Sequence, residues 1–235
     1  MKLLAFIPVL LFTTALRAQS EQPAAPSKVY FSGSGELIFS APILDVNGSD
    51  KGSVVRFSPF FNVQSILNMD VSEHVGFFTG LGLRNQGFIY QVPDTNIRYK
   101  FRTYNIGIPV GMKIGTMNKE LVYFGYELEL PFNYKEKKFI DGDREDRFDV
   151  WFGDRTERLF HSVFLGFQGP YGSNLTIRYY LNNFHNTAFK ETKDGVTTTP
   201  YAGMKENIIA VSLGFGLFDK DSGRHHHSST KLKSN

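Results

Sequence analysis

Seven charged side chains interrupt segments that otherwise alternate between large apolar and small residues, and they are the first candidates for chemistry. If the segments are β-strands, these charges all point to the face opposite the large apolar residues, because successive side chains of a strand alternate between faces. Charges enclosed away from water must pair. The pattern predicts a structural ion-pair network; the alternative is a gate or ion pathway that opens when pairs exchange. The seven residues are Glu36, Arg56, Arg84, Lys113, Glu127, Glu129 and Arg178.

Catalysis needs a nucleophile beside a base, and the neighbours His161 and Ser162 are the nearest candidates for a hydrolase. Adjacent residues of a strand point to opposite faces, so these two side chains cannot share a proton. The sequence contains no G-x-S-x-G motif, and neither His74 nor His185 has an evident carboxylate or nucleophile partner. We therefore predict no catalytic residue and no cofactor.

The densest run of charge is DGDREDRFD at 141–149, where Asp141, Asp143 and Glu145 occupy alternate positions as in a calcium loop. An EF-hand needs glycine at the sixth position and glutamate at the twelfth, and the chain has Asp146 and a phenylalanine there. A solvated outer loop is the preferred interpretation, with Trp151 beside it as a recognition aromatic. Calcium binding, or bridging of lipopolysaccharide through divalent ions, is the alternative. Three consecutive histidines at 225–227 are read as incidental, so no metal site is predicted.

The elements that must position these residues are strands. From Tyr104 to Ile114 every even position is a large apolar residue, and the same holds from Val122 to Phe132. A period of two is the signature of a β-strand. Eight segments show it, at 28–40, 53–68, 75–90, 101–116, 120–134, 158–169, 174–186 and 205–218.

The connections alternate in length. Tight turns at 70–74, 116–119 and 169–173 separate longer stretches at 41–52, 91–100, 135–157 and 187–204. Short turns at one end and long loops at the other are typical of an outer-membrane up-and-down barrel, with short turns and both termini facing the periplasm. The predicted fold is all-β: a single closed antiparallel transmembrane barrel of eight strands, with ten as the alternative.

Volume decides which face points outward. The apolar faces carry several tens of large side chains, whereas the interior of an eight-stranded barrel holds on the order of a dozen. The apolar set must therefore face lipid, and the small and charged set must fill a plugged lumen. The final segment ends at Phe218 and resembles the aromatic-terminated last strand of outer-membrane barrels.

Composition agrees with a single domain outside the cytoplasm. The chain has 235 residues, no cysteine and a formal net charge of +3, which gives little support to nucleic-acid binding. Residues 1–18 are predicted to be a signal peptide, with Lys2 before an apolar run and cleavage after Ala18. Residues 19–27 are expected to be a flexible linker, 28–218 the barrel, and 219–235 a polar periplasmic tail.

Three stretches together resemble the PorT-like outer-membrane β-barrel family of Bacteroidota. They are VGFFTGLGLRNQGF (75–88), TYNIGIPVGMKIG (103–115) and YFGYELELPF (123–132). In that family a glycine-rich strand precedes an aromatic-x-x-x-Pro-x-x-x-Lys strand, for which this chain offers Tyr104, Ile108-Pro109 and Lys113. The resemblance implies an outer-membrane barrel and no single activity.

The sequence thus predicts a non-enzymatic outer-membrane protein with a structural, assembly or surface-contact role through its long outer loops. Three alternatives remain open: a narrow porin-like channel for small solutes or ions, a lipid-modifying enzyme, and a soluble ligand-binding barrel that would appear in the periplasmic fraction. The expected partners are outer-membrane lipid and lipopolysaccharide, together with other envelope proteins, and nucleic acid is not among them.

Overall fold

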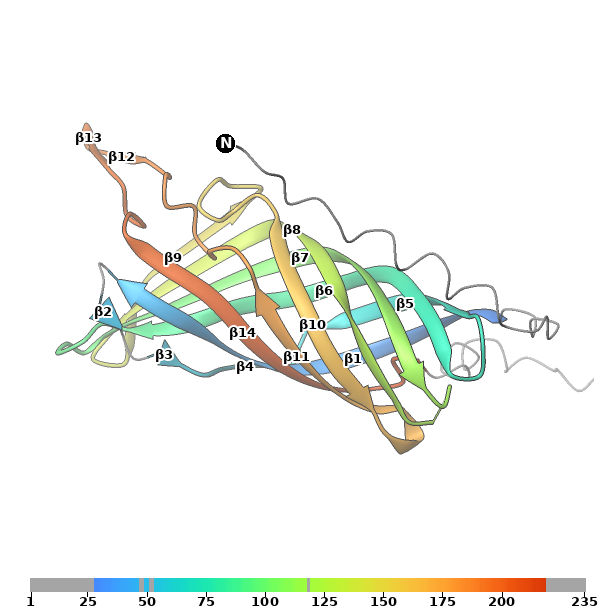
Figure 1. Cartoon of the computed structure of the whole chain (residues 1–235). Coiled ribbons are helices and arrows are strands. Elements are labelled where there is room, and N and C mark those ends of the chain that lie inside the picture. Colours follow the sequence, from blue (N-terminus) through green and yellow to red (C-terminus); the bar gives the residue numbers. More distant parts are fainter. Residues whose placement is uncertain (1–27, 47–48, 51–52, 118, 219–235) are drawn as a thin grey trace, which may run out of the picture.

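The computed structural model describes residues 28–46, 49–50, 53–117 and 119–218, in which eight long strands form a ring (Figure 1). The eight strands are β1 (Lys28–Val46), β5 (Val63–Asp70), β6 (Val75–Gln91), β7 (Ile97–Gly115), β8 (Leu121–Ile140), β10 (Phe160–Gln168), β11 (Ser173–Tyr180) and β14 (Met204–Phe215). The shorter elements are β2 (Ser49–Asp50), β3 (Ser53–Val54), β4 (Arg56–Ser58), β9 (Asp143–Trp151), η1 (Pro170–Gly172), β12 (Glu191–Lys193) and β13 (Val196–Thr198). No helix in these described ranges is long and apolar enough to cross a membrane.

Three pairings complete the ring. β14 pairs antiparallel with β1 from Gly35↔Phe215 to Val46↔Met204, and β10 pairs antiparallel with both β8 and β11. All other neighbours in the ring are antiparallel too. The eight-stranded barrel is therefore confirmed, and the ten-stranded alternative is wrong. Closure matters because an unpaired strand edge would leave main-chain groups without hydrogen bonds in lipid.

The barrel is apolar outside and polar inside. On β14, Ile209 and Leu213 are 38% and 46% exposed, whereas Ala210 and Ser212 between them are each 3% exposed. The same alternation runs along β5, β10 and β11. Large apolar side chains therefore form a belt around the outer wall, as expected for a barrel in contact with lipid.

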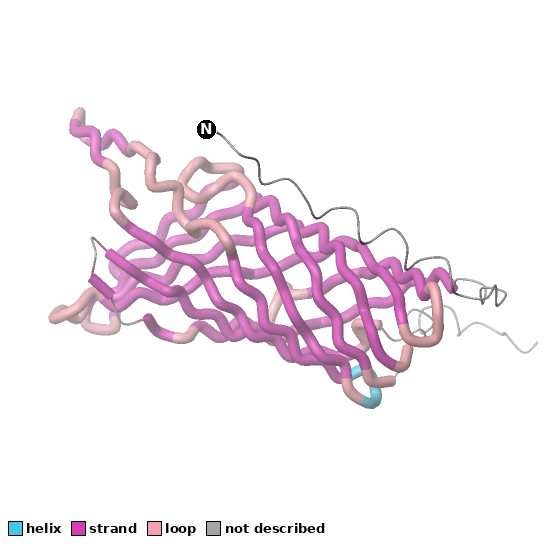
Figure 2. The backbone as a smooth tube through the Cα atoms, viewed as in Figure 1, coloured by secondary structure: helices cyan, strands magenta, loops and turns pink. Residues whose placement is uncertain are grey.

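The two ends of the barrel differ in their connections. Three tight turns lie at the end where β1 begins and β14 ends, including the turn at η1, and the longer connections lie at the opposite end (Figure 2). The β12–β13 hairpin projects beyond the barrel at the long-loop end (Figure 1). This arrangement agrees with the predicted alternation of short and long connections except between β6 and β7, where the predicted long stretch at 91–100 is only the five residues 92–96.

Glycines on the inner wall make room for aromatic rings. A Cβ added to Gly111 would lie 2.4 Å from the Phe78 ring, and one added to Gly166 would lie 2.2 Å from the Tyr123 ring. The glycine-rich face of the strands therefore does not leave an open lumen, because rings from neighbouring strands occupy the space that the missing side chains leave.

Several predicted boundaries were wrong: β1 extends to Val46, β7 begins at Ile97, and β11 ends at Tyr180. Residues 135–157 are not one loop, because β8 continues to Ile140 and pairs with β9 across the turn at Asp141–Gly142. The segment 53–68 divides into β3, β4 and β5, and the stretch 187–204 contains the β12–β13 hairpin. Charged residues suggested loops at 135–151, but beyond the lipid belt a strand exposes its outer face to water, so charge and strand pairing are compatible there.

Candidate functional site

The centre of the lumen holds a dense ion-pair network built around Arg84 on β6. Its guanidinium Nε and Nη2 each lie 3.0 Å from a carboxylate oxygen of Glu127, and its Nη1 pairs with Glu36. Arg178 on β11 reaches the same Glu127 carboxylate from the far side, at 2.7 Å. All these side chains are at most 5% exposed. The network therefore ties opposite walls of the barrel together.

The third acid of the network, Glu129, is held mainly by neutral donors. Tyr180 donates its hydroxyl hydrogen to Glu129 Oε1 at 2.7 Å, and Asn105 donates to Oε2 at 2.7 Å, while Arg84 Nε lies 3.7 Å away. Gln64 joins Glu36 and Arg84, donating to the first at 2.8 Å and accepting from the second at 3.1 Å. The five charged groups comprise three acids and two bases, so neutral donors stabilise the excess carboxylate.

Lys113 lies apart from this network, closer to the short-turn end. Its Nζ is 2.7 Å from Asp70 Oδ1 and donates to the Tyr30 hydroxyl at 2.9 Å and to Asn68 Oδ1 at 3.0 Å. The ammonium also lies 5.0 Å from the centre of the Phe218 ring. Its three donors thus have three oxygen partners, as a buried ammonium requires.

Arg56 lies in the barrel wall between β1 and β6. It lies on β4, which pairs with β1, and it donates across to the Asn85 carbonyl on β6 at 3.1 Å. Ser58 donates to the same carbonyl at 3.2 Å. The structure therefore brings Glu36, Arg84, Glu127, Glu129 and Arg178 together, and places Lys113 and Arg56 at separate positions.

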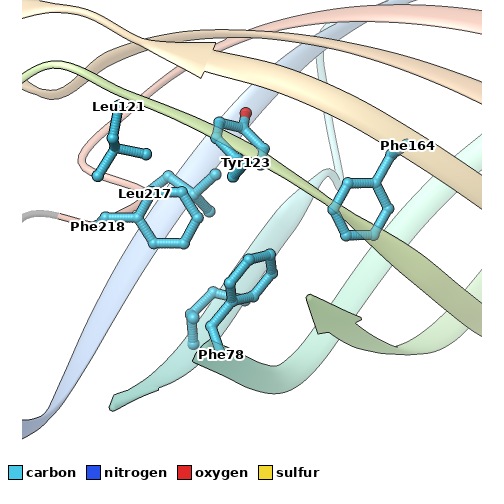
Figure 3. Packing of buried hydrophobic residues seen from close by; sticks show 7 residues of the cluster. Phe78, Leu121, Tyr123, Phe164, Leu217 and Phe218 are labelled. Carbon is cyan, nitrogen blue, oxygen red and sulfur yellow. The ribbon is translucent and has the colours of Figure 1, made fainter. Parts of the chain in front are cut away.

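Two apolar clusters close the lumen on either side of the central network. The lower cluster, near the short turns, consists of Ile66, Phe78, Leu121, Tyr123, Phe164, Leu217 and Phe218 (Figure 3). The upper cluster consists of Phe88, Phe101, Tyr134, Phe160, Tyr180, Phe184 and Ile208. The space between Arg84 and the lower cluster measures about 10 Å³, and the space beside Phe160 and Phe184 of the upper cluster measures about 0 Å³. A single water needs about 10–15 Å³ on the same measure.

Phe218 does not end the last strand, so that prediction was wrong. β14 ends at Phe215, which is 70% exposed, and the chain then turns inward. The Phe218 ring lies 5.0 Å from that of Phe78 and 4.9 Å from that of Tyr123, and its N–H donates to Gln168 Oε1 at 3.1 Å. Phe218 thus fills the lower end of the lumen.

The outer mouth of the barrel is built around His185, which sequence reasoning left without a partner. Its Nδ1 lies 2.8 Å from Glu206 Oε2, and its Nε2 lies 3.1 Å from the Tyr134 hydroxyl. Tyr201 stacks on the imidazole with ring centres 4.0 Å apart, and Arg155 donates to the Tyr201 hydroxyl at 3.0 Å. Burial, followed by the nearby carboxylate of Glu136, raises the pKa of Tyr201. Glu206 is an even number of residues from the inward-facing Ala210 on the same strand. Extending the alternation along that strand would therefore have predicted that Glu206 faces inward.

The residues considered for catalysis do not converge. Ser162 is 0% exposed and faces the lumen, whereas His161 lies on the outer wall in contact with the Tyr126 hydroxyl. His74 lies in a short turn, where its Nδ1 is 3.2 Å from the Gly115 carbonyl. Within the described part of the chain no group of three or more acidic or histidine side chains is arranged to hold a metal ion. The histidines at 225–227 lie outside the described residues.

The four residues proposed for outer-loop recognition are likewise dispersed. Asp141 forms the β8–β9 turn and accepts a hydrogen bond from Asn96 at 2.6 Å, while Asp143 and Glu145 are exposed on β9. Trp151 lies at the end of β9 and stacks on Phe132 with ring centres 5.8 Å apart.

Trp151 belongs to a row of aromatic rings on the outer wall that sequence reasoning missed. Phe132 lies 6.4 Å from Tyr104, which lies 5.6 Å from Phe61, so the row crosses from β9 to the segment before β5. We call Phe61, Tyr104, Phe132 and Trp151 the aromatic row. It follows the upper edge of the apolar belt, where the exposed pair Ile106 and Leu130 ends the lipid-facing residues of β7 and β8. Aromatic rings concentrate at this level in membrane barrels.

No protein-family model and no curated protein matches the chain. Among solved structures it is similar to Neisserial surface protein A, at 11% identity over 81% of this chain and 99% of that one, with a TM-score of 0.37. It is also similar to Ail, the attachment invasion locus protein of Yersinia pestis (12% identity, 80% and 97% coverage, TM-score 0.34). A third similar structure is CarO2 of Acinetobacter baumannii (12% identity, 80% and 99% coverage, TM-score 0.38). At these values the fold rests on the strand pairing described above, and no function is carried over.

Proposed function

We propose that the chain is a non-enzymatic protein of the bacterial outer membrane with a closed, charged lumen. Its role is structural, as an assembly component or a surface-contact protein, and is exerted through the β8–β9 and β12–β13 hairpins at the long-loop end. The expected partners are outer-membrane lipid, lipopolysaccharide and other envelope proteins.

The observation that carries this proposal is the filling of the lumen. A solute crossing the barrel would have to displace the upper cluster, the Arg84 network and the lower cluster in succession. The space between Arg84 and the lower cluster measures about 10 Å³, and the space beside Phe160 and Phe184 measures about 0 Å³. Breaking a buried ion pair by withdrawing one partner costs about 3–5 kcal/mol. A narrow channel therefore receives less support than a plugged barrel.

The placement in the outer membrane is supported by the lipid-facing belt and by the connections. In barrels of this kind short turns face the periplasm and long loops face outward. The proposal includes export by a signal peptide at 1–18 that is cleaved after Ala18; these residues, the linker at 19–27 and the tail at 219–235 lie outside the described residues. It also includes kinship with the PorT-like barrels, on the sequence pattern of 75–132.

A lipid-modifying enzyme would need a nucleophile and a base on the outer wall. His161 is there, but its contact is a tyrosine hydroxyl, and Ser162 faces inward. Unchanged lipid A masses in cells that express the protein are therefore expected, and a new lipid A species would contradict the assignment as a non-enzyme.

The placement and orientation can be tested with single cysteines, because the chain has none of its own. We expect a membrane-impermeant maleimide to label D194C, at the β12–β13 turn, in intact cells. It should label S72C, in a short turn, only after the cells are broken. Labelling of S72C but not D194C in intact cells would reverse the orientation, and labelling of neither would remove the protein from the cell surface.

A further inference from the structure

Six cations lie side by side on the outer wall immediately above the aromatic row. Three come from β7, two from β8 and one from β9. The register places Arg102 opposite Lys135, Lys100 opposite Lys137, and Lys137 opposite Arg147. Like charges directly opposite each other in a sheet are destabilising. The cluster therefore needs a counter-charge. We call Arg98, Lys100, Arg102, Lys135, Lys137 and Arg147 the basic patch.

The protein itself supplies little of that counter-charge. Asp149 pairs with Lys135 at 3.1 Å and with Arg147 at 3.4 Å. Burial acts to raise the pKa of Asp149, but hydrogen bonds from Asn133 and Lys135 outweigh it and hold the pKa below its usual range. Within the described ranges, Lys100, Arg102 and Lys137 form no ion pair with a carboxylate.

Burial and neighbouring cations together lower the pKa of two lysines of the patch. Burial, and then the neighbouring Arg98, Arg102 and Arg56, lower the pKa of Lys100. Burial, and then Arg102, Arg144 and Arg147, lower the pKa of Lys137. Aromatic faces give partial compensation, since Lys100 Nζ lies 4.8 Å from the centre of the Phe139 ring and Lys135 Nζ lies 5.5 Å from that of Tyr104.

The patch lines a groove of about 310 Å³ with mixed chemistry. Five of its cations, together with Arg56, contribute to the walls, and Phe57, Ile89 and Phe139 supply apolar surface. In the part of the chain that the structure describes, no carboxylate lines this groove. A volume of this size lies at the lower end of the range for small-ligand sites. The groove thus combines a cationic lining with apolar edges, as an amphipathic anion requires.

We propose that the basic patch binds the phosphate groups of the lipid A headgroup of lipopolysaccharide in the outer leaflet. The inference rests on the orientation given under the proposed function, which sets the patch at the outer leaflet. The position of the patch favours a lipid over a soluble anion. Arg102 and Lys135 lie directly above Tyr104, with their cationic groups 6.0 and 5.5 Å from the centre of its ring. The lipid-facing belt begins just below Tyr104. Acyl chains along the belt therefore bring a phosphorylated headgroup to the height of the patch. Arginine and lysine are the side chains that recognise phosphate.

The test uses the full chain in nanodiscs of neutral phospholipid, with lipid A added and binding measured by native mass spectrometry. The ligands are bis-phosphorylated lipid A, the same lipid A after enzymatic removal of both phosphates, and inorganic phosphate as a competitor. The test variant is K100Q/R102Q/K137Q, which leaves the Asp149 pairs intact. The matched control is R158Q/K190Q/K193Q, which removes three exposed cations at the same end of the barrel.

We expect the phosphorylated lipid to bind at least tenfold more tightly than the dephosphorylated one. The test variant should lose roughly 100-fold, at about fivefold for each cation near an anionic headgroup, and the control should bind as the wild type does. Equal binding of the two lipids, or equal loss in the control, overturns the proposal. If millimolar inorganic phosphate competes fully, the assignment of a lipid headgroup as the source of the bound phosphate is overturned.

The lipid A site and the proposed function can be refuted separately. If the protein inserts and orients as proposed but does not distinguish the two lipids, the basic patch fails as a lipid A site and the proposed function stands. If the cysteine labels show no surface exposure, both are overturned.

Discussion

Replacing Arg84 by methionine should destabilise the barrel more than any change on its surface. Arg84 is the cation that pairs with Glu36 and with Glu129, whereas Glu127 keeps Arg178 at 2.7 Å. R84M therefore leaves two carboxylates in a lumen without a cationic partner. Removing one partner of a buried ion pair costs about 3–5 kcal/mol, so we expect a loss of at least about 3 kcal/mol in the free energy of unfolding.

The compensating variant separates this electrostatic effect from lost packing. R84M/E36Q/E129Q removes the two unpaired carboxylates and retains the Glu127–Arg178 pair. Replacing both partners of a buried pair by neutral groups is often close to neutral. We therefore expect the triple variant to recover most of the loss, to within about 1–2 kcal/mol of the wild type, the remainder reflecting the smaller side chain.

The assay is urea unfolding from lipid vesicles, followed by fluorescence and by heat-modifiable gel mobility. Trp151 is the single tryptophan, so the emission reports one position on the outer wall. K100Q serves as a surface control, with an expected change within about 0.5 kcal/mol. The reasoning is refuted if R84M unfolds at the same urea concentration as the control, or if the triple variant is no more stable than R84M.

Four further predictions follow from other sites. K113M should lose about 3–5 kcal/mol because it leaves Asp70 unpaired, and K113M/D70N should recover part of that loss in the same urea assay; no difference between the two would refute the pairing. F218A should lose about 3–5 kcal/mol through the cavity left beside Phe78 and Tyr123, whereas F215A, on the exposed surface, should lose far less. E206Q should loosen the segment that His185 holds and speed tryptic cleavage after Lys190 or Lys193 several-fold; unchanged cleavage would contradict that role. Burial and neighbouring arginines lower the pKa values of Lys100 and Lys137, so both lysines lose their charge at a lower pH than free lysine does. Lipid A binding should therefore weaken as the pH rises through the alkaline range. In the nanodisc titration, K100Q/K137Q should make binding less dependent on pH.

The alternation of apolar and small or charged residues, with a period of two, predicted most of the fold. Alternation placed Glu36, Arg84, Lys113 and Glu127 on the inner wall, and the structure finds each of them buried there. The apolar faces point outward, as the number of large side chains predicted. Alternation holds whenever one face meets lipid and the other does not, so it is readable from one sequence.

The parts that sequence reasoning missed depend on contacts between distant segments. Phe218 follows the end of β14 and points into the lumen because it packs on Phe78 and Tyr123. The residues next to Phe218 in the sequence do not predict this contact. His185 and Glu206 meet only because the chain folds back over the barrel mouth.

The basic patch was missed for a related reason. Arg102, Lys135 and Arg147 are far apart in the sequence, and their alignment depends on a register shift between Tyr104 and Asn105 in the β7–β8 pairing. The charged stretch 135–157, predicted as one loop, instead contains the end of β8 and all of β9, which pair with each other and, through β8, with β7. Strand pairing beyond the lipid belt lacks the apolar alternation that identifies it elsewhere.

The most direct test of the closed lumen is the conductance of the purified protein in planar lipid bilayers, after heat-modifiable mobility has established that it is folded. A silent barrel is expected, because the Arg84 network and the two apolar clusters fill the lumen. The space between Arg84 and the lower cluster measures about 10 Å³, and the space beside Phe160 and Phe184 measures about 0 Å³. Stable single-channel conductance that shifts on E127Q substitution would contradict this expectation and would make the lumen charges the lining of a pore.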